Sequence, residues 1–431
     1  MLITNATLAD GNRADVRIEG KRIATVGSLE GEPDIDAAGK LLLPGAIDAH
    51  VHFREPGFPH KETWETGSKS AAAGGVTTVI DQPNTEPPTI TGASFEAKSR
   101  LARESAVDYG INGGVTEGWN PDELFSAPMA ALGEVFLADS TGEMGIDTEL
   151  FGKAVERASR EGVVVTVHAE DATLFDEGAL KGAGNGGGRE ADADAWSAFR
   201  RAEAEAAAVE RACEIGERAD AAIHIAHTST PEGIDIASEA GATCEVTPHH
   251  LFLSRADLDG LGTYGRMNPP LRSEERRKKL FERVRDGTVD IVATDHAPHT
   301  IEEKEAGIRE APSGVPGVET MVPLLLAAAE RGELTRERVR DLTARNPARI
   351  FDLPRKGRIE EDMDADLALY DPQEREEIRG EGLHSKAGWT PFEGFEAIFP
   401  EWTMVRGTVV YDRSSGTERF GGTRGRNVRE R

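Results

Sequence analysis

The sequence predicts an α/β protein: a closed (β/α)8 barrel of the TIM type with a small β-domain formed by the two ends of the chain. Three observations lead to this fold. Short apolar runs alternate with helical segments through the middle of the chain, strand-like stretches occupy both ends, and the His residues follow the apolar runs. A chain of 431 residues is long enough for a barrel of ordinary size with a smaller appendage.

Both ends of the chain have the pattern of β-structure. Residues 1–45 contain four short strand patterns, at residues 2–4, 15–18, 22–26 and 40–43. The same pattern returns in residues 355–431, at residues 366–370 and 402–411. Gly, Asn and Pro separate these stretches and favour turns. Because chain ends often meet in space, we expect residues 1–45 and 355–431 to form one small domain beside a barrel of residues 46–354.

The middle of the chain alternates between candidate strands and helices. The apolar runs lie at residues 76–80, 133–137, 163–167, 222–225, 243–246 and 290–293. The clearest helical segments lie at residues 96–106, 148–161, 202–217, 273–284 and 319–329. Such alternation indicates βα units on a parallel sheet, and the number of units favours a closed barrel. A doubly wound open sheet is the alternative, but no GxGxxG follows a first strand and no GxxxxGK[ST] is present.

Composition and charge exclude several classes of function. The formal net charge of −27 argues against nucleic-acid binding, and no apolar run approaches the ~20 residues that span a bilayer. Because Cys213 and Cys244 are the only cysteines and the N-terminus has no signal-peptide pattern, we expect a reduced, cytoplasmic compartment. Acidic residues are scattered along the whole length and Arg outnumbers Lys, which suggests adaptation to high salt.

His and Asp residues at the ends of predicted strands carry the chemistry. His50 and His52 are two positions apart, so on a strand both imidazoles share one face and point into the barrel mouth. This spacing alone is weak evidence for a metal site. The placement recurs at His168, His227 and Asp295, each at the end of an apolar run, where barrel active sites are built. The sequence therefore predicts a metal centre.

Several segments also carry a family resemblance, which covers essentially the whole chain. They are PGAIDAHVHFREPG, VTVHAED, HIAHTST, RMNPPLR, ATDHAPH and SKAGWTPFEG. These segments resemble the amidohydrolase superfamily, and most closely its dihydroorotases. The resemblance implies a metal centre, with two ions per chain expected and one possible, which would polarise a carbonyl and activate a water. Zn²⁺ is the expected metal for a His-rich hydrolytic site, with Mn²⁺ or Co²⁺ as alternatives. The implied protein ligands are His50, His52, His168, His227 and Asp295.

The same resemblance implies a reaction and a substrate. The reaction would be the reversible cyclisation of N-carbamoyl-L-aspartate to L-dihydroorotate in pyrimidine biosynthesis, with Asp295 as general acid and base. Arg54 lies two residues after His52, on the same face, where a guanidinium can grip a carboxylate; a structural ion pair is the alternative. Dihydroorotases carry Arg here, whereas allantoinase-like sequences typically carry Asn. Further substrate contacts are implied for His52, Asn84, Asn268, His299, Ser313 and Gly314.

One segment departs from the family pattern. Many relatives bridge two metals with a carboxylated Lys, but residues 132–142 contain no Lys, and Glu134 stands at the Lys position. Glu keeps a carboxylate on a shorter arm, so we expect Glu134 to be a ligand, with Asp139 as second candidate. The alternative is that neither acid reaches the metals and a single Zn²⁺ is bound.

Two competing functions follow from the same residues. One is a hydantoinase or allantoinase with the same chemistry on a neutral ring. The other is a non-catalytic relative retained as an assembly partner, although all four His and the Asp are in place. We expect a small-molecule substrate, no nucleic-acid or membrane partner, and possible homo-oligomers. His224, His249 and His250 are expected to be structural.

Overall fold

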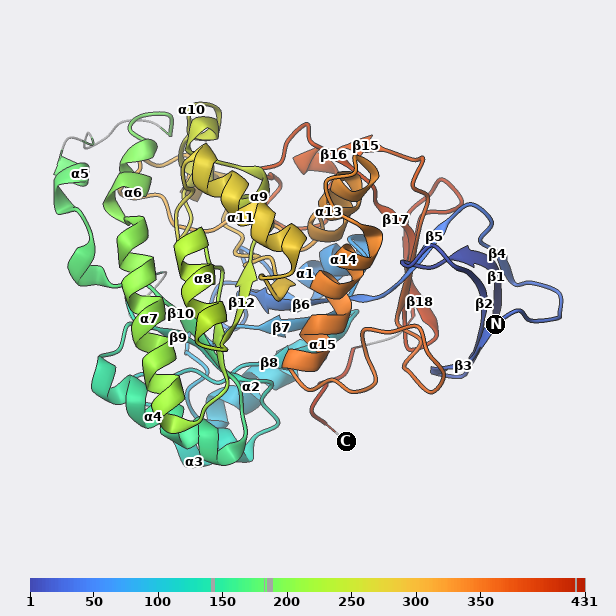
Figure 1. The fold of residues 1–431 in the computed structure, drawn as a ribbon, viewed down its shortest axis with the longest axis horizontal. Coiled ribbons are helices and arrows are strands. Elements are labelled where there is room, and N and C mark those ends of the chain that lie inside the picture. The colour runs from blue at the N-terminus through green and yellow to red at the C-terminus, as the bar shows by residue number, and fades with distance from the viewer. Residues whose placement is uncertain (141–143, 182, 184–188, 423–424, 431) are drawn as a thin grey trace.

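The structure is a computed structural model that describes residues 1–140, 144–181, 183, 189–422 and 425–430. Its centre is a barrel of eight parallel strands in these residues (Figure 1). The strands are β6 (Ala46–Val51), β7 (Val76–Asp81), β8 (Asp108–Ile111), β9 (Leu132–Phe136), β10 (Val165–His168), β11 (Ile223–Ile225), β12 (Thr243–Val246) and β13 (Ile291–Val292). Parallel bridges from Gly113 to Leu132 and from Val51 to His296 close the barrel. The predicted (β/α)8 fold is confirmed.

Helices connect these strands and cover the outside of the barrel. The main ones are α1 (Trp64–Ala73), α2 (Gly92–Ala102), α3 (Pro121–Ser126), α4 (Thr148–Glu161), α7 (Ala202–Ala219), α8 (Pro231–Glu239), α11 (Glu274–Asp286) and α13 (Met321–Glu330). Shorter helices are α5 (Glu177–Lys181), α6 (Asp194–Phe199), α9 (Pro248–Phe252), α10 (Leu258–Leu261), α12 (Ile301–Lys304), α14 (Arg336–Arg340) and α15 (Asn346–Ile350). Helix α4 shows how sequence sets the bounds: the Asp147 side chain caps its first turn, and Gly162 ends it at φ 66°.

Two predicted elements differ from the structure in their bounds or their form. The helix predicted at residues 96–106 is α2, which begins at Gly92 because Thr91 and Ser94 form a capping box, and ends at Ala102. The stretch at 402–411, predicted to be strand-like and broken by turn residues, is a hairpin of two strands, with a turn at Arg406 and Gly407, both at positive φ.

Both ends of the chain meet in one nine-stranded sheet beside the barrel, on the right of Figure 1. Its order is β19-β18-β17-β14-β5-β1-β2-β3, with β4 also paired to β1. These strands are β1 (Leu2–Thr7), β2 (Arg13–Glu19), β3 (Arg22–Gly27), β4 (Ile35–Asp36), β5 (Leu41–Pro44), β14 (Leu367–Tyr370), β17 (Pro400–Val405), β18 (Thr408–Asp412) and β19 (Arg419–Phe420). A separate pair is formed by β15 (Glu376–Glu377) and β16 (Glu396–Ala397).

Strand β5 joins the two ends of the chain. It runs parallel to β1, and its Leu42 lies opposite Leu369 of antiparallel β14. One face of the sheet buries a separate apolar cluster that includes Ile3, Leu42, Leu369 and Trp402. The domain boundaries at residues 45 and 355 stay predictions, although this pairing agrees with them.

No helix among the described residues is long and apolar enough to cross a membrane.

Candidate metal centre

The predicted ligands converge at the carboxyl end of the barrel. His50 lies on β6, Glu134 on β9 and His168 at the end of β10, while His227 and Asp295 follow β11 and β13. All of these side chains are buried, with at most 7% of each residue exposed. Two of them, His227 at φ 32° and Asp295 at φ 46°, hold a left-handed backbone conformation that non-Gly residues rarely adopt.

Two groups of these side chains have the spacing of metal ligands. In the first, the donor atoms of His50, His52 and Asp295 lie within 4.8 Å of one another. The Nε2 atom of His52 lies 2.9 Å from Oδ1 of Asp295, and Nε2 of His50 lies 3.6 Å from the same oxygen. Imidazole and carboxylate donors of this kind suit Zn²⁺.

Glu134 is the centre of the second group, with His50 and His227. Its Oε1 atom lies 2.6 Å from Nε2 of His227 and 3.0 Å from Nδ1 of His168, and its Oε2 atom lies 3.3 Å from Nε2 of His50. The two ring nitrogens of His168 and His227 face each other at 3.0 Å, an arrangement that a shared proton or a cation would stabilise. The structure therefore brings Glu134 to three His side chains.

The burial of the ligand atoms, and the lack of hydrogen-bond partners for two of them, show whether a metal ion fits this site. The Nε2 atom of His50 and the Nδ1 atom of His227 are buried and have no hydrogen-bond partner among the described residues. Burial raises the pKa of the Glu134 carboxyl, but His50 and His227 outweigh it and hold that pKa well below its usual range. A buried anion surrounded by imidazole lone pairs is the donor set that a divalent cation requires. The residues fit the predicted metal.

Two acidic residues that the sequence analysis did not single out hold the His rings. Oε1 of Glu245 on β12 lies 2.6 Å from Nδ1 of His50, and Oε2 of Glu170 lies 3.0 Å from Nε2 of His168. Glu170 is itself bound by Arg200 at 2.6 Å. Carboxylates in this position fix which nitrogen of a ligating His faces the metal. For Glu245 the available signal was an acid inside the run 243–246, which was predicted as a buried strand, and for Glu170 it was an acid two residues after His168.

A small cavity opens beside the ligands. Nearly all predicted substrate residues line it; its lining is His52, Arg54, Asn84, Glu134, Phe136, Ser140, His168, His227, Asn268, Asp295, Ala297, Ser313 and Gly314. Phe136, Ser140 and Ala297 are additions to the predicted set. His299 lies one layer behind, with Nε2 2.9 Å from the Ser313 carbonyl oxygen.

Arg54 has no ion pair with a described carboxylate. Its Nε donates to the Pro298 carbonyl at 3.2 Å, and one terminal nitrogen lies 3.1 Å from Nε2 of His299. Lys61 donates to Nδ1 of His299 at 3.1 Å, so Nε2 carries the ring proton and donates to Ser313. Protonated Nε2 then has no lone pair to accept from Arg54, so the terminal nitrogens of the guanidinium keep donors available for an anion. Burial lowers the pKa of Arg54 to about 10.

The asparagines have different neighbours. Asn84 accepts from Nδ1 of His52 at 2.7 Å, so it orients that ring while lining the cavity. Asn268 accepts from the Trp196 indole at 2.9 Å and donates to Oγ of Ser140 at 3.0 Å. Asp139, the second candidate for the Lys position, is exposed and accepts from the Gly145 backbone.

His residues expected to be structural have protein partners. His224 lies 2.8 Å from Oγ1 of Thr243 and 3.1 Å from Oε2 of Glu245, the same carboxylate that holds His50. His250 bonds Thr247 and the Pro269 carbonyl. His249 is buried, and its Nε2 has no hydrogen-bond partner among the described residues.

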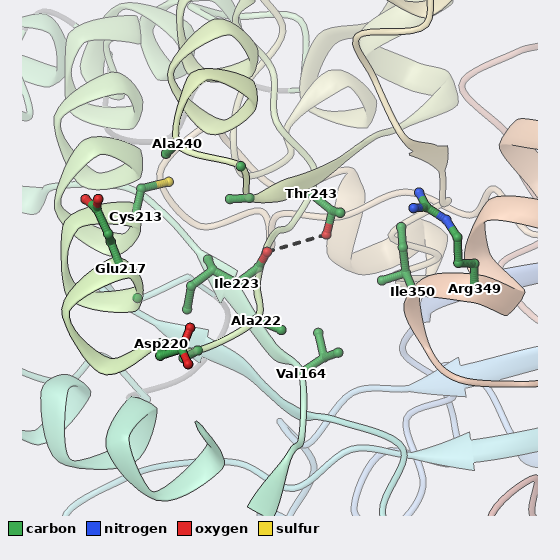
Figure 2. A pocket seen from close by; sticks show the side chains of 14 residues that line it. Val164, Cys213, Glu217, Asp220, Ala222, Ile223, Ala240, Thr243, Arg349 and Ile350 are labelled. Atoms are coloured by element: carbon green, nitrogen blue, oxygen red, sulfur yellow. Dashed lines mark hydrogen bonds between the residues drawn. The ribbon is translucent and has the colours of Figure 1, made fainter. Parts of the chain in front are cut away.

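A second pocket lies at the opposite end of the barrel, where β10, β11 and β12 begin (Figure 2). Val164, Ile223, Thr243 and Cys213 line it, and Thr243 donates to the Ile223 carbonyl at 3.4 Å. Neither group of candidate metal ligands lies in this lining. The candidate ligands therefore lie at the carboxyl end of the barrel and not at this pocket.

Comparison with known proteins agrees with this geometry. The amidohydrolase family matches residues 41–410. A dihydroorotase of Halobacterium salinarum is 61% identical over 100% of both chains, and one of Methanosarcina mazei is 47% identical over 93% of this chain and 91% of the relative. Among solved structures, an L-hydantoinase (dihydropyrimidinase) from Arthrobacter aurescens superposes with a TM-score of 0.89 at 29% identity, covering 95% of this chain and 96% of that one. The chain belongs to the amidohydrolase family, and its curated relatives at 61% and 47% identity are dihydroorotases.

Proposed function

We propose that this protein is a dihydroorotase, which reversibly closes N-carbamoyl-L-aspartate to L-dihydroorotate in pyrimidine biosynthesis. The observation that carries the proposal is Arg54, a buried guanidinium that pairs with no carboxylate among the described residues and lines the same cavity as Asp295 and the His ligands. A neutral cyclic amide offers no anion for it, whereas dihydroorotate carries a carboxylate. The full-length identity to dihydroorotases supports the same choice.

The metal ligands would be His50, His52, Glu134, His168, His227 and Asp295. Zn²⁺ bound there, with two ions as the expected count, would polarise the ring carbonyl and activate the attacking water. Glu134 serves as an unmodified carboxylate at the position where relatives carry a carboxylated Lys, because it contacts three ligating rings.

Asp295 would move the proton. Burial raises its pKa, but the bond from His52 and the nearby His50 outweigh this and lower it, which keeps the side chain a carboxylate able to accept a proton. In hydrolysis it takes a proton from the attacking water and delivers it to the leaving ring nitrogen. In cyclisation it would remove the proton from the attacking carbamoyl nitrogen and deliver it to the carboxylate oxygen that leaves as water.

The other cavity residues would bind and orient the substrate. Arg54 grips the carboxylate, and the Pro298 carbonyl, which accepts from its Nε, fixes the guanidinium plane. Asn268 and the backbone at Ser313 and Gly314 offer amide groups to the ring, and Asn84 and His52 face the same space. A cyclic ureide presents alternating N–H and C=O groups, which amide donors and acceptors of this kind match.

The experiment is a direct assay of the purified chain loaded with Zn²⁺. We expect turnover in both directions with dihydroorotate and N-carbamoyl-aspartate, and loss of turnover in Asp295→Asn. Hydrolysis of hydantoin or allantoin without turnover of dihydroorotate would establish the hydantoinase alternative. No bound metal and no rate in either direction would establish the non-catalytic assembly protein. A cytoplasmic location and homo-oligomers stay predictions.

The acidic composition supports a further proposal about conditions. The net charge of −27 is scattered along the chain, and a relative of Halobacterium salinarum is 61% identical. We propose that the protein is adapted to high salt, where its self-repulsion is screened.

A further inference from the structure

Lys304, at the end of α12, is a fully buried lysine for which no carboxylate partner is found among the described residues. It is 0% exposed. Its Nζ donates to three backbone carbonyl oxygens, those of Arg266 at 3.0 Å, Pro312 at 3.0 Å and Gly314 at 3.1 Å. A buried ammonium is expensive unless all its N–H groups are bonded, so this arrangement needs a reason.

The three acceptors fit the protonated side chain. An ammonium has three N–H donors, one for each carbonyl, whereas a neutral amine would turn its lone pair toward one of the oxygens. Burial and the nearby Arg266 and Arg54 lower the pKa of Lys304 well below its usual range. The three carbonyl oxygens oppose this and favour the charged form.

The carbonyls belong to two loops that line the cavity. One loop contains Arg266 and Asn268, and the other contains Ser313 and Gly314. The Gly314 N–H also donates to the Arg266 carbonyl at 3.0 Å, and Oγ of Ser313 donates to Oδ1 of Asn268 at 3.2 Å. Lys304 therefore stands at the junction where both loops are fixed to each other.

The junction leaves little room for an alternative loop position. Gly314 has φ +131°, and a Cβ built there would lie 2.6 Å from the Ala297 carbonyl oxygen. The Ser313 carbonyl accepts from His299, whose ring contacts Arg54. The loop that Lys304 holds is thus connected to the residue proposed to bind the carboxylate.

We propose that Lys304 is a positioning residue for substrate binding, which sets the backbone at Ser313 and Gly314 at the distance that the bound ring requires. The inference rests on the proposed function, because that function places the ring against this backbone. Lys304 lines neither the cavity nor the ligand groups, so it acts through the loops rather than by touching substrate.

The test compares Lys304→Met and Lys304→Gln with wild type, measuring KM and kcat for dihydroorotate, bound metal and thermal midpoint. We expect KM to rise about tenfold to a hundredfold in Lys304→Met, with metal content unchanged and kcat much less affected. Lys304→Gln keeps two N–H donors, so its KM should lie between those of the wild type and Lys304→Met. If Lys304→Met does not fold, the KM of Lys304→Gln still decides.

Lys356→Met is the matched control. Lys356 is also buried, but it pairs with Asp108 and Asp366 at the opposite end of the barrel from the cavity. Its loss should lower the midpoint without moving KM. An unchanged KM in both Lys304 variants, or an equal KM change in Lys356→Met, would overturn the proposal. Failure of the wild type to turn over dihydroorotate would instead overturn the proposed function.

Discussion

Nδ1 of His50 lies 2.6 Å from Oε1 of Glu245, and the same carboxylate, through Oε2, contacts His224 at 3.1 Å. The carboxylate thus joins a candidate ligand to a His deeper in the barrel. Because Nδ1 of His50 is occupied, only Nε2 remains to face a metal.

The first prediction concerns this carboxylate. Glu245→Gln keeps the size of the side chain but removes the charge that holds the His50 proton on Nδ1. We expect metal affinity to fall about tenfold to a hundredfold, measured by competition with a chelator. Glu239→Gln, at the exposed end of α8, should bind metal like the wild type. Equal affinity in both variants would show that Glu245 does not orient the ligand.

The second prediction separates the two acids that could replace the Lys of relatives. Glu134→Gln should lower the number of metal ions bound per chain and abolish most activity, because Glu134 contacts three His rings. Asp139→Asn is the matched control and should change neither, since Asp139 is exposed. Elemental analysis of both purified variants gives the count. Unchanged stoichiometry in Glu134→Gln would remove it from the ligand set.

The third prediction concerns the binding of the substrate carboxylate by Arg54. Arg54→Lys keeps a positive charge but loses the planar pair of donors, at a cost of about 1.5–3 kcal/mol for hydrogen bonds to a charged group. This corresponds to a rise in KM for dihydroorotate of roughly tenfold to a hundredfold. Steady-state kinetics in both directions measures it. The exposed Arg103→Lys is the control, and wild-type KM in Arg54→Lys would contradict the role.

The fourth prediction concerns stability and pH. His384 lies 2.8 Å from Oε1 of Glu319 and 3.3 Å from Oε2 of Glu418. Burial lowers the pKa of His384, but these carboxylates outweigh it and raise that pKa above its ordinary value of 6.5. A raised folded-state pKa stabilises the fold fully below pH 6.5, and this contribution is lost as the pH rises through the folded pKa.

We therefore expect the free energy of unfolding to fall above pH 6.5, and to fall less steeply in His384→Gln. Denaturant unfolding of both proteins across this range measures the difference. His60→Gln, whose side chain is 58% exposed, should follow the wild type. A wild-type slope in His384→Gln would show that the ion pairs contribute nothing.

The fifth prediction follows from the net charge of −27. Because salt screens repulsion between exposed charges, the thermal midpoint should rise steadily as KCl is added from ~0.1 M to molar concentrations. Calorimetry at several KCl concentrations checks this. A midpoint that does not depend on salt would contradict adaptation to high salt.

Much of the fold and the ligand set followed from periodicity. His50 and His52 share a strand face at a spacing of two, and His168 and Asp295 end apolar runs, so local pattern places them at one end of the barrel. Strand β8 was missed because Asp108–Ile111 is short and contains a Gly. Such a segment becomes a strand only through its neighbours, here by pairing with β7.

The roles of the two acids that hold the His rings, Glu245 and Glu170, could not be predicted from local sequence patterns, for a different reason. Glu245 binds His50, which is distant in the chain. Glu170 is held by Arg200, 30 residues later, and Lys304 bonds carbonyls from two loops. No spacing rule encodes a partner 195 residues away, as His50 is from Glu245. These contacts appear only when the barrel is closed.

The pairing of β5 with β14 also affects how the chain is made. Leu42 can pair with Leu369 only after more than three quarters of the protein has been synthesised. Until then, one edge of β5 has no partner strand. Contacts so remote in sequence are slow to form, and an open edge is where incomplete chains aggregate. Aggregation during translation is therefore most favoured at β5, immediately before the strand that carries His50. We expect dependence on chaperones to be greatest until residue 370 has been synthesised.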